Sequence, residues 1–225
     1  MPSIYQQALG DDYERLHPQI RERFGLQSED GVACIGRGVM DRIWYNRVAA
    51  LPLAIGARRH LMFPQSGEQV PFTVHNYAYT DRWGRETVSW VRKFRFPGRL
   101  RQFDATMIYS DERRRIVDYL GNRQHLAVDL ELSVDPRGGI RIRSGEQRCY
   151  EGPLQFRWPE LFTGVAEVCE WYDEAADCYR IEVDVTSPLL GPVFRYAGRF
   201  QAEFVECPPS ALPLDIQPLR EERRE

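Results

Sequence analysis

Apolar and polar side chains alternate along most of this chain, and this period of two constrains the fold more than any other feature. The clearest case is 125–134, where every second residue is a leucine or a valine. Strict alternation of this kind is typical of a β-strand that buries one face. The same pattern recurs at 86–96, 178–186 and 193–206, so the sequence predicts a mainly β protein.

The alternating segments predict strands near 32–44, 70–80, 86–96, 101–110, 113–120, 124–134, 139–150, 164–173, 178–186 and 193–206. Short, turn-like links join most of them, so consecutive strands pair as hairpins in an antiparallel meander. A meander of about ten strands closes into a barrel or splits into a sandwich. Because the links are tight, we expect a single antiparallel β-barrel domain over 1–207. A helix-grip fold is the alternative, but it needs a long C-terminal helix.

Two helical regions accompany the predicted strands. Helices are expected within 1–30, because Ser3 is suited to cap a first helix and Pro18 to occupy the first turn of another. An apolar, helix-like stripe at 46–63, between the first two strands, predicts a helical lid insertion. This layout is similar to calycins and intracellular lipid-binding clamshells, whose helices cap the mouth of a ligand cavity.

Prolines mark two segments that cannot continue the pattern. In 153–164 they predict a loop with a short helical turn around 159–162. The tail 208–225 contains four prolines, and we expect it to be flexible.

Charge and cysteine usage exclude several classes of protein. Lys and Arg number 30 against 33 Asp and Glu, whereas nucleic-acid-binding domains are usually basic, so we expect no nucleic-acid partner. The first residues do not resemble a secretory signal, and no run reaches the roughly 20 apolar residues of a membrane helix. Five cysteines show no zinc or redox spacing, which favours free thiols in a cytoplasmic protein.

No sequence motif indicates a cofactor, a metal or a nucleophilic triad. The acids that lie within predicted strands are scattered, and no histidine completes a ligand set with them: Asp104, Asp118, Asp129 and Glu131. Neither Gly-x-Gly-x-x-Gly nor Gly-x-Ser-x-Gly occurs. We therefore expect no cofactor and no metal, and the sequence favours a protein that is not an enzyme.

Polar residues on rows that should face inward are the most informative anomaly. Arg92 interrupts an otherwise apolar row of its strand, and the row begun by Ile140 and Ile142 continues into polar residues. An ionised side chain is costly in a filled core but tolerated in a cavity. The predicted cavity lining comprises Arg92, Glu146, Arg148 and Tyr150, with Trp90 and Phe94 nearby. The guanidinium groups suit a ligand carboxylate or phosphate.

A purely structural interpretation of the same residues stays open. Glu146 and an arginine can form a buried ion pair that binds nothing, and a bulge near Gly145 would reverse which side chains face inward.

His75 and Tyr77 share one face of the second predicted strand. As binding or catalytic residues they would supply a general base and a hydrogen-bond donor. The alternative is an aromatic row that stabilises cross-strand pairs. Both faces carry apolar or aromatic side chains, so alternation does not decide which one is interior.

Several long motifs resemble a bacterial family catalogued as domain of unknown function 4166. They include PFTVHNY at 71–77 and SGEQR at 144–148, with further stretches at 5–10, 16–19, 38–40, 84–87, 103–107 and 150–153. The resemblance covers 3–206 and implies no activity. Members of that family occur alone or behind a dehydrogenase-like nucleotide-binding domain, a context that implies handling of a small organic or lipid-like molecule.

These observations favour a non-catalytic binding module whose barrel cavity holds a small apolar, lipid-like or acidic ligand. One alternative is a cavity isomerase or cyclase, with Glu146 or His75 as base and Arg148 or Tyr77 stabilising charge. The other is an accessory domain that docks to an oxidoreductase partner. Arginines around the 46–63 insertion also suggest a transient contact with an anionic membrane surface.

Overall fold

The computed structural model describes residues 2–159 and 163–225. The helices are α1 (Ile4–Leu9), α2 (Pro18–Phe24) and α3 (Ala50–Ala57), with short 3-10 turns between and after them. The strands are β1 (Val32–Tyr45), β2 (Gly67–Thr80), β3 (Glu86–Phe96), β4 (Arg99–Ser110), β5 (Arg115–Leu120), β6 (Leu126–Val134), β7 (Ile140–Glu151), β8 (Leu154–Arg157), β9 (Val165–Asp173), β10 (Cys178–Ser187) and β11 (Gly191–Glu206).

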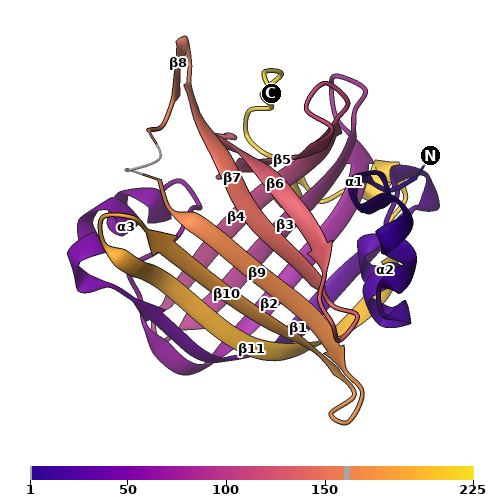
Figure 1. Ribbon diagram of the computed structural model, residues 1–225, viewed down its shortest axis with the longest axis horizontal. Helices are drawn as coiled ribbons and strands as arrows, with labels where there is room; N and C mark the ends of the chain where they lie inside the picture. Colours follow the sequence, from indigo (N-terminus) through magenta and orange to yellow (C-terminus); the bar gives the residue numbers. More distant parts are fainter. Residues whose placement is uncertain (1, 160–162) are drawn as a thin grey trace.

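All the strands belong to one antiparallel sheet that closes on itself (Figure 1). Neighbours run in the order β6-β5-β4-β3-β2-β1-β11-β10-β9-β7, and the pairing of β6 with β7 completes a ten-stranded barrel. The predicted antiparallel barrel is therefore confirmed. The short strand β8 falls in a segment predicted to be a loop, and it pairs with the end of β7 outside the closed ring.

The N-terminal helices close one end of the barrel, at the right of Figure 1. Ser3 caps α1 through a capping box, and Pro18 occupies the first turn of α2, as the sequence predicts. The apolar stripe Leu16, Ile20 and Phe24 is buried against the interior core.

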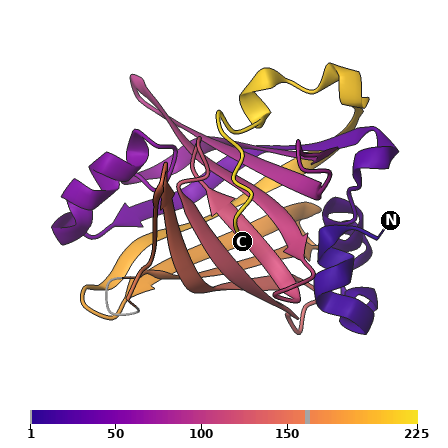
Figure 2. The same cartoon turned by 90° about the horizontal axis from the view of Figure 1, so that it is seen from above.

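The opposite end carries α3, which lies at the left in Figures 1 and 2. Its Leu53 is buried, and Phe63 beyond the helix packs edge-on against Phe94 and Phe194 inside the barrel. The insertion between β1 and β2 therefore covers this end, as a lid would. Among the described residues, none of the helices combines the length and apolar character that crossing a bilayer demands.

The tail 208–225, for which the sequence predicts flexibility, lies along the outside of the barrel (Figure 2). Ile216 is buried against Tyr77 and Tyr79, and its carbonyl accepts a hydrogen bond from Ser89 Oγ at 2.6 Å. The prolines favour an extended chain, and an extended chain can follow a surface as well as leave it. The residue pattern of the tail could not show that the barrel has an apolar outer surface on which the tail packs.

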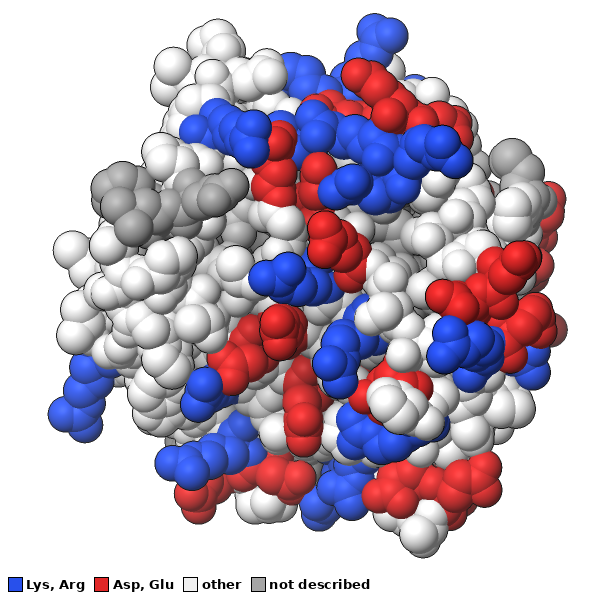
Figure 3. All heavy atoms as spheres, viewed as in Figure 1, with Lys and Arg blue, Asp and Glu red and all other residues white. Residues whose placement is uncertain are grey.

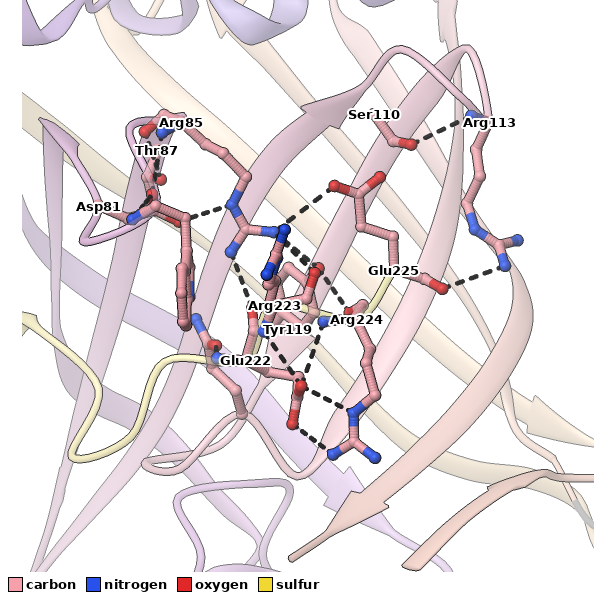
Figure 4. Close-up of polar contacts among 12 residues, drawn as sticks. Asp81, Arg85, Thr87, Ser110, Arg113, Tyr119, Glu222, Arg223, Arg224 and Glu225 are labelled. Carbon is pink, nitrogen blue, oxygen red and sulfur yellow. Dashed lines mark hydrogen bonds and ion pairs between the residues drawn. The ribbon is translucent and has the colours of Figure 1, made fainter. Parts of the chain in front are cut away.

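Figure 4 shows that barrel side chains hold the last part of the tail largely by its main chain. Arg85 Nη2 donates to the carbonyl oxygen of Glu222 at 2.8 Å, and Tyr119 Oη donates to that of Arg224 at 2.9 Å. Arg113 Nη2 donates to the carbonyl oxygen of Glu225 at 3.2 Å. This segment is thus anchored by the outer face of β5 and by the turns between β2 and β3 and between β4 and β5.

A buried ion pair fastens the helical end to the barrel. Arg23 of α2 donates from Nε to Glu170 Oε1 of β9 at 2.5 Å, and both side chains are essentially inaccessible to solvent. The same guanidinium donates to Asn76 Oδ1 at 2.7 Å and lies 5.0 Å from the Phe200 ring centroid. Because each charge is buried, each depends on the other for compensation.

Removing one member of this pair should destabilise the barrel strongly. We expect Glu170→Ala to lower the free energy of unfolding by about 3–5 kcal/mol, because Arg23 would remain buried without its counter-charge. The double variant Arg23→Met/Glu170→Leu should recover much of that loss. Urea unfolding followed by tryptophan fluorescence measures both.

The exposed pair Arg37–Glu203 is a matched control, since its side chains are 61% and 63% accessible. Arg37→Met should change stability by less than about 1 kcal/mol. If the variants of the buried and the exposed pair lost equal amounts of unfolding free energy, the stabilising role assigned to Arg23 and Glu170 would be wrong.

Candidate functional site

The interior of the barrel contains a cavity of about 130 Å³. Its walls are mainly apolar and come from most strands, with Phe103, Val128, Ile142 and Phe194 among them. Larger hollows lie on the outer surface, such as one of about 690 Å³, but they are open to solvent. The interior cavity is less open to solvent than these hollows and has a mainly apolar wall, which favours it as the place where a small molecule would be held.

Arg92 of β3 projects into this cavity from the interior row of its strand. Its guanidinium carbon lies 3.8 Å from the centroid of the Phe103 ring and 5.7 Å from that of Trp90. The side chain is buried, and Nε has no hydrogen-bond partner within the described part of the chain. A desolvated donor without a partner is costly, so Arg92 is suited to receive an acceptor from a ligand.

Asp118 of β5 faces the same cavity. Burial raises the pKa of its carboxyl from 3.8 to about 7, and the positive charge of Arg92 opposes that rise. Its Oδ1 has no hydrogen-bond partner among the described residues. Near neutral pH this carboxyl therefore exists in both protonation states.

Together Arg92 and Asp118 form a polar patch in the mainly apolar wall of the cavity, which we call the interior polar pole. The guanidinium can donate two parallel hydrogen bonds to a carboxylate, and a protonated Asp118 can donate a third. Ser144 and Gln147 also line the cavity, but their side chains bond to the backbone nitrogen of Ala166 and the carbonyl of Gly164. Among the described residues that line the cavity, Arg92 and Asp118 are the two with a buried side-chain atom that has no hydrogen-bond partner.

Of the predicted site residues, the structure brings Arg92 and Trp90 to the cavity wall. Phe94 is fully buried in the same interior, where it packs against Phe63 and Phe72 instead of lining the cavity.

The other members of the predicted lining, Glu146, Arg148 and Tyr150, lie on the outside of the barrel. The β6–β7 register passes from Leu130↔Ser144 to Val128↔Gln147, so β7 contains one extra residue at 145–146. This bulge reverses the side-chain alternation beyond it. The expected convergence of Arg92, Glu146, Arg148 and Tyr150 on one interior space therefore does not occur.

Arg148 instead takes part in an ion-pair network on the outer face. Its Nη2 donates to Asp129 Oδ1 at 2.6 Å and its Nη1 to Glu146 Oε1 at 3.0 Å. Tyr150 is buried beside Tyr119, beneath the tail. The structural alternatives raised from the sequence, an Arg–Glu pair and a bulge near Gly145, describe this region.

His75 and Tyr77 also face outward. Tyr77 packs with Ile35, Tyr79 and the tail residue Ile216. His75 is half-buried, and burial lowers the pKa of its imidazole. Neither residue contributes to the lining of the interior cavity.

Asp118 was weighed in the sequence only as a metal ligand, and its place in the cavity was missed. A signal existed: Ile116, Asp118 and Leu120 share one row of a predicted strand, so an acid interrupts an apolar row as Arg92 does.

Among the described residues, no group of three or more His, Cys, Asp or Glu side chains is arranged to hold a metal ion. All five cysteines are free thiols.

The raised pKa of Asp118 predicts how stability depends on pH. Asp118 binds its proton more tightly in the folded protein than in the unfolded chain, so ionising it lowers the free energy of unfolding. This free energy should therefore fall as pH rises from about 4 to about 7 and then stay level. Asp118→Asn should remove this dependence and raise the free energy of unfolding at pH 8 by up to about 3–4 kcal/mol. Urea titrations at several pH values measure it.

Asp135 is the matched control with the opposite sign. The hydrogen bond from Arg137 holds its pKa at about 2, so its stabilisation is present above pH 4 and is lost as pH falls towards 2. Asp135→Asn should therefore lower stability at pH 8. If Asp118→Asn also destabilised the protein at pH 8, the assigned ionisation of Asp118 would be wrong.

Comparisons with known proteins give one family and one similar protein. A family model described as "Domain of unknown function (DUF4166)" matches residues 16–200. The chain is 33% identical over 204 residues to "Uncharacterized protein YndH" of Bacillus subtilis (strain 168), which covers 90% of this chain and 98% of that protein. No solved structure matches the chain significantly.

Proposed function

We propose that this chain, which belongs to the DUF4166 family, is a non-catalytic binding module for a small apolar molecule with an acidic group. One observation carries the proposal: the mainly apolar interior cavity contains two buried polar groups, Arg92 and Asp118, each with an atom that lacks a hydrogen-bond partner among the described residues. A ligand carboxylate would satisfy both groups while its apolar part fills the remaining space.

The cavity volume limits the size of the ligand. About 130 Å³ is close to the roughly 150 Å³ of an engineered cavity that binds benzene. The ligand, or the part of it that enters the barrel, is therefore about the size of one aromatic ring. Benzoate is a suitable probe, and toluene is its neutral counterpart of similar shape.

Benzoate binding should depend on Arg92. We expect Arg92→Met to weaken the affinity for benzoate by about 10–100-fold, because a charged hydrogen-bond donor is lost while the bulk is kept. Toluene should bind the variant at least as well as the wild type. Isothermal titration calorimetry at pH 6 measures both affinities.

Arg148→Met is the matched control, since Arg148 is as deeply buried as Arg92 but lies on the outer face. It should lower stability and leave benzoate affinity unchanged. Loss of benzoate binding in Arg148→Met but not in Arg92→Met would refute the interior site.

Binding should also weaken as pH rises. Above about pH 7 Asp118 is ionised and repels a carboxylate, whereas below it the protonated group donates a hydrogen bond. Benzoate affinity should therefore fall by about tenfold or more between pH 6 and pH 8, and Asp118→Asn should abolish most of this change. A wild-type affinity independent of pH would show that Asp118 does not meet the ligand.

A cavity isomerase or cyclase is a second candidate, because a carboxyl with a pKa of about 7 suits general acid–base catalysis near neutral pH. In that case Asp118 would take the role that the sequence suggested for Glu146 or His75. NMR spectra of a ligand purified with the protein, recorded before and after incubation with fresh protein, separate the two candidates, because an isomerase or cyclase changes the ligand's structure whereas a binding module returns it unchanged.

A further inference from the structure

The lid helix α3 is apolar on its outer side as well as its inner side. Leu53 is buried beneath it, yet Val48 and Leu51 are each 73% exposed and Ile55 is 53% exposed. Leu51 and Ile55 of α3 are four residues apart and share one helical face, and Val48 lies in the 3-10 turn directly before the helix, three residues from Leu51. Large apolar side chains grouped in this way on a protein surface usually mark a site of interaction.

More apolar side chains are exposed at the same end of the barrel. Leu189 and Leu190, in the turn between β10 and β11, are 52% and 39% exposed. Asn46 Nδ2, just before the lid, donates hydrogen bonds to the carbonyl oxygens of Leu190 at 3.3 Å and Pro192 at 3.2 Å. The end that carries α3 is mostly white in Figure 3, whereas charged side chains crowd the rest of that face.

Arginines border this apolar surface. Arg47 precedes α3 and Arg58 follows it, and both are exposed and form no ion pair with any described residue. Beside the lid, Arg58, Arg59 and Arg123 line an open hollow of about 550 Å³ in which Glu151 is the acidic residue. An apolar helix face with a basic border complements the interface of an anionic bilayer.

We infer that the lid end of the barrel docks on an anionic membrane surface, with Val48, Leu51 and Ile55 inserted among the lipid headgroups. A second copy of the chain fits less well, because a two-fold contact would place the unpaired arginines of one lid near those of the other. This docking goes beyond the proposed binding of a ligand and does not depend on it.

Vesicle flotation with the full chain tests the docking. The protein should float with vesicles of phosphatidylcholine mixed with phosphatidylglycerol, and much less with phosphatidylcholine alone. Val48→Ser/Leu51→Ser/Ile55→Ser should weaken binding to the mixed vesicles by at least about tenfold, because the inserted apolar area is lost. Arg47→Gln/Arg58→Gln should weaken it by about tenfold or more.

Two control variants match these changes. Leu214→Ser removes an apolar side chain that is 91% exposed on the flank of the barrel, and it should bind vesicles as the wild type does, whereas Leu51→Ser should bind more weakly. Arg82→Gln/Arg114→Gln neutralises two exposed arginines in the turns that follow β2 and β4, and it should also bind normally.

An unchanged midpoint of urea unfolding shows that the lid variants are folded, and this readout keeps the test separate from that of the interior site. Absence of wild-type binding to the mixed vesicles would overturn the docking. So would a dimer in analytical ultracentrifugation that the triple serine variant abolishes, because the lid would then be covered by a second copy.

Discussion

The hydrogen bonds between β6 and β7 turn an open sheet into a barrel, and the rest of the structure depends on that closure. Closure removes the sheet edges and gives each strand an inner and an outer row of side chains. The same pairing contains the bulge at 145–146, which moves Glu146, Arg148 and Tyr150 to the outer face. One irregularity in one strand pair therefore separates the interior polar pole from the outer ion-pair network.

The sequence was a reliable guide to the strands because burial of one face imposes a period of two. The predicted strands at 86–96 and 193–206 correspond closely to β3 and β11. The cavity was harder to predict. The extra residue at 145–146 of β7 moves every later side chain of that strand to the opposite side of the sheet, yet the sequence there still alternates. Arg92 was identified since it interrupts an apolar row within an unbroken strand. Asp118 interrupts its row in the same way, but pattern alone does not show that the two residues share one cavity.

Two sets of buried charges in the interior have different partners. At the helical end Arg23 and Glu170 compensate each other and join α2 to the sheet. In the wall of the cavity, Arg92 and Asp118 have no such mutual ion pair in the described structure, and each retains an unpartnered atom. The first pair holds the fold together through its own ion pair, although Arg23 Nη2 and Glu170 Oε2 also lack a hydrogen-bond partner among the described residues. The second leaves hydrogen-bonding capacity that a bound molecule can use.

The way the tail is held has a consequence for how the family can vary. Arg85, Arg113 and Tyr119 donate to carbonyl oxygens of 222–225, groups that every residue type possesses. Side chains in this part of the tail can therefore drift between relatives without loss of these bonds, whereas insertions would shift the carbonyls out of register. In an alignment of relatives, we therefore expect the donor residues on the barrel and the length of the tail to be conserved, and the residue types within the tail to vary.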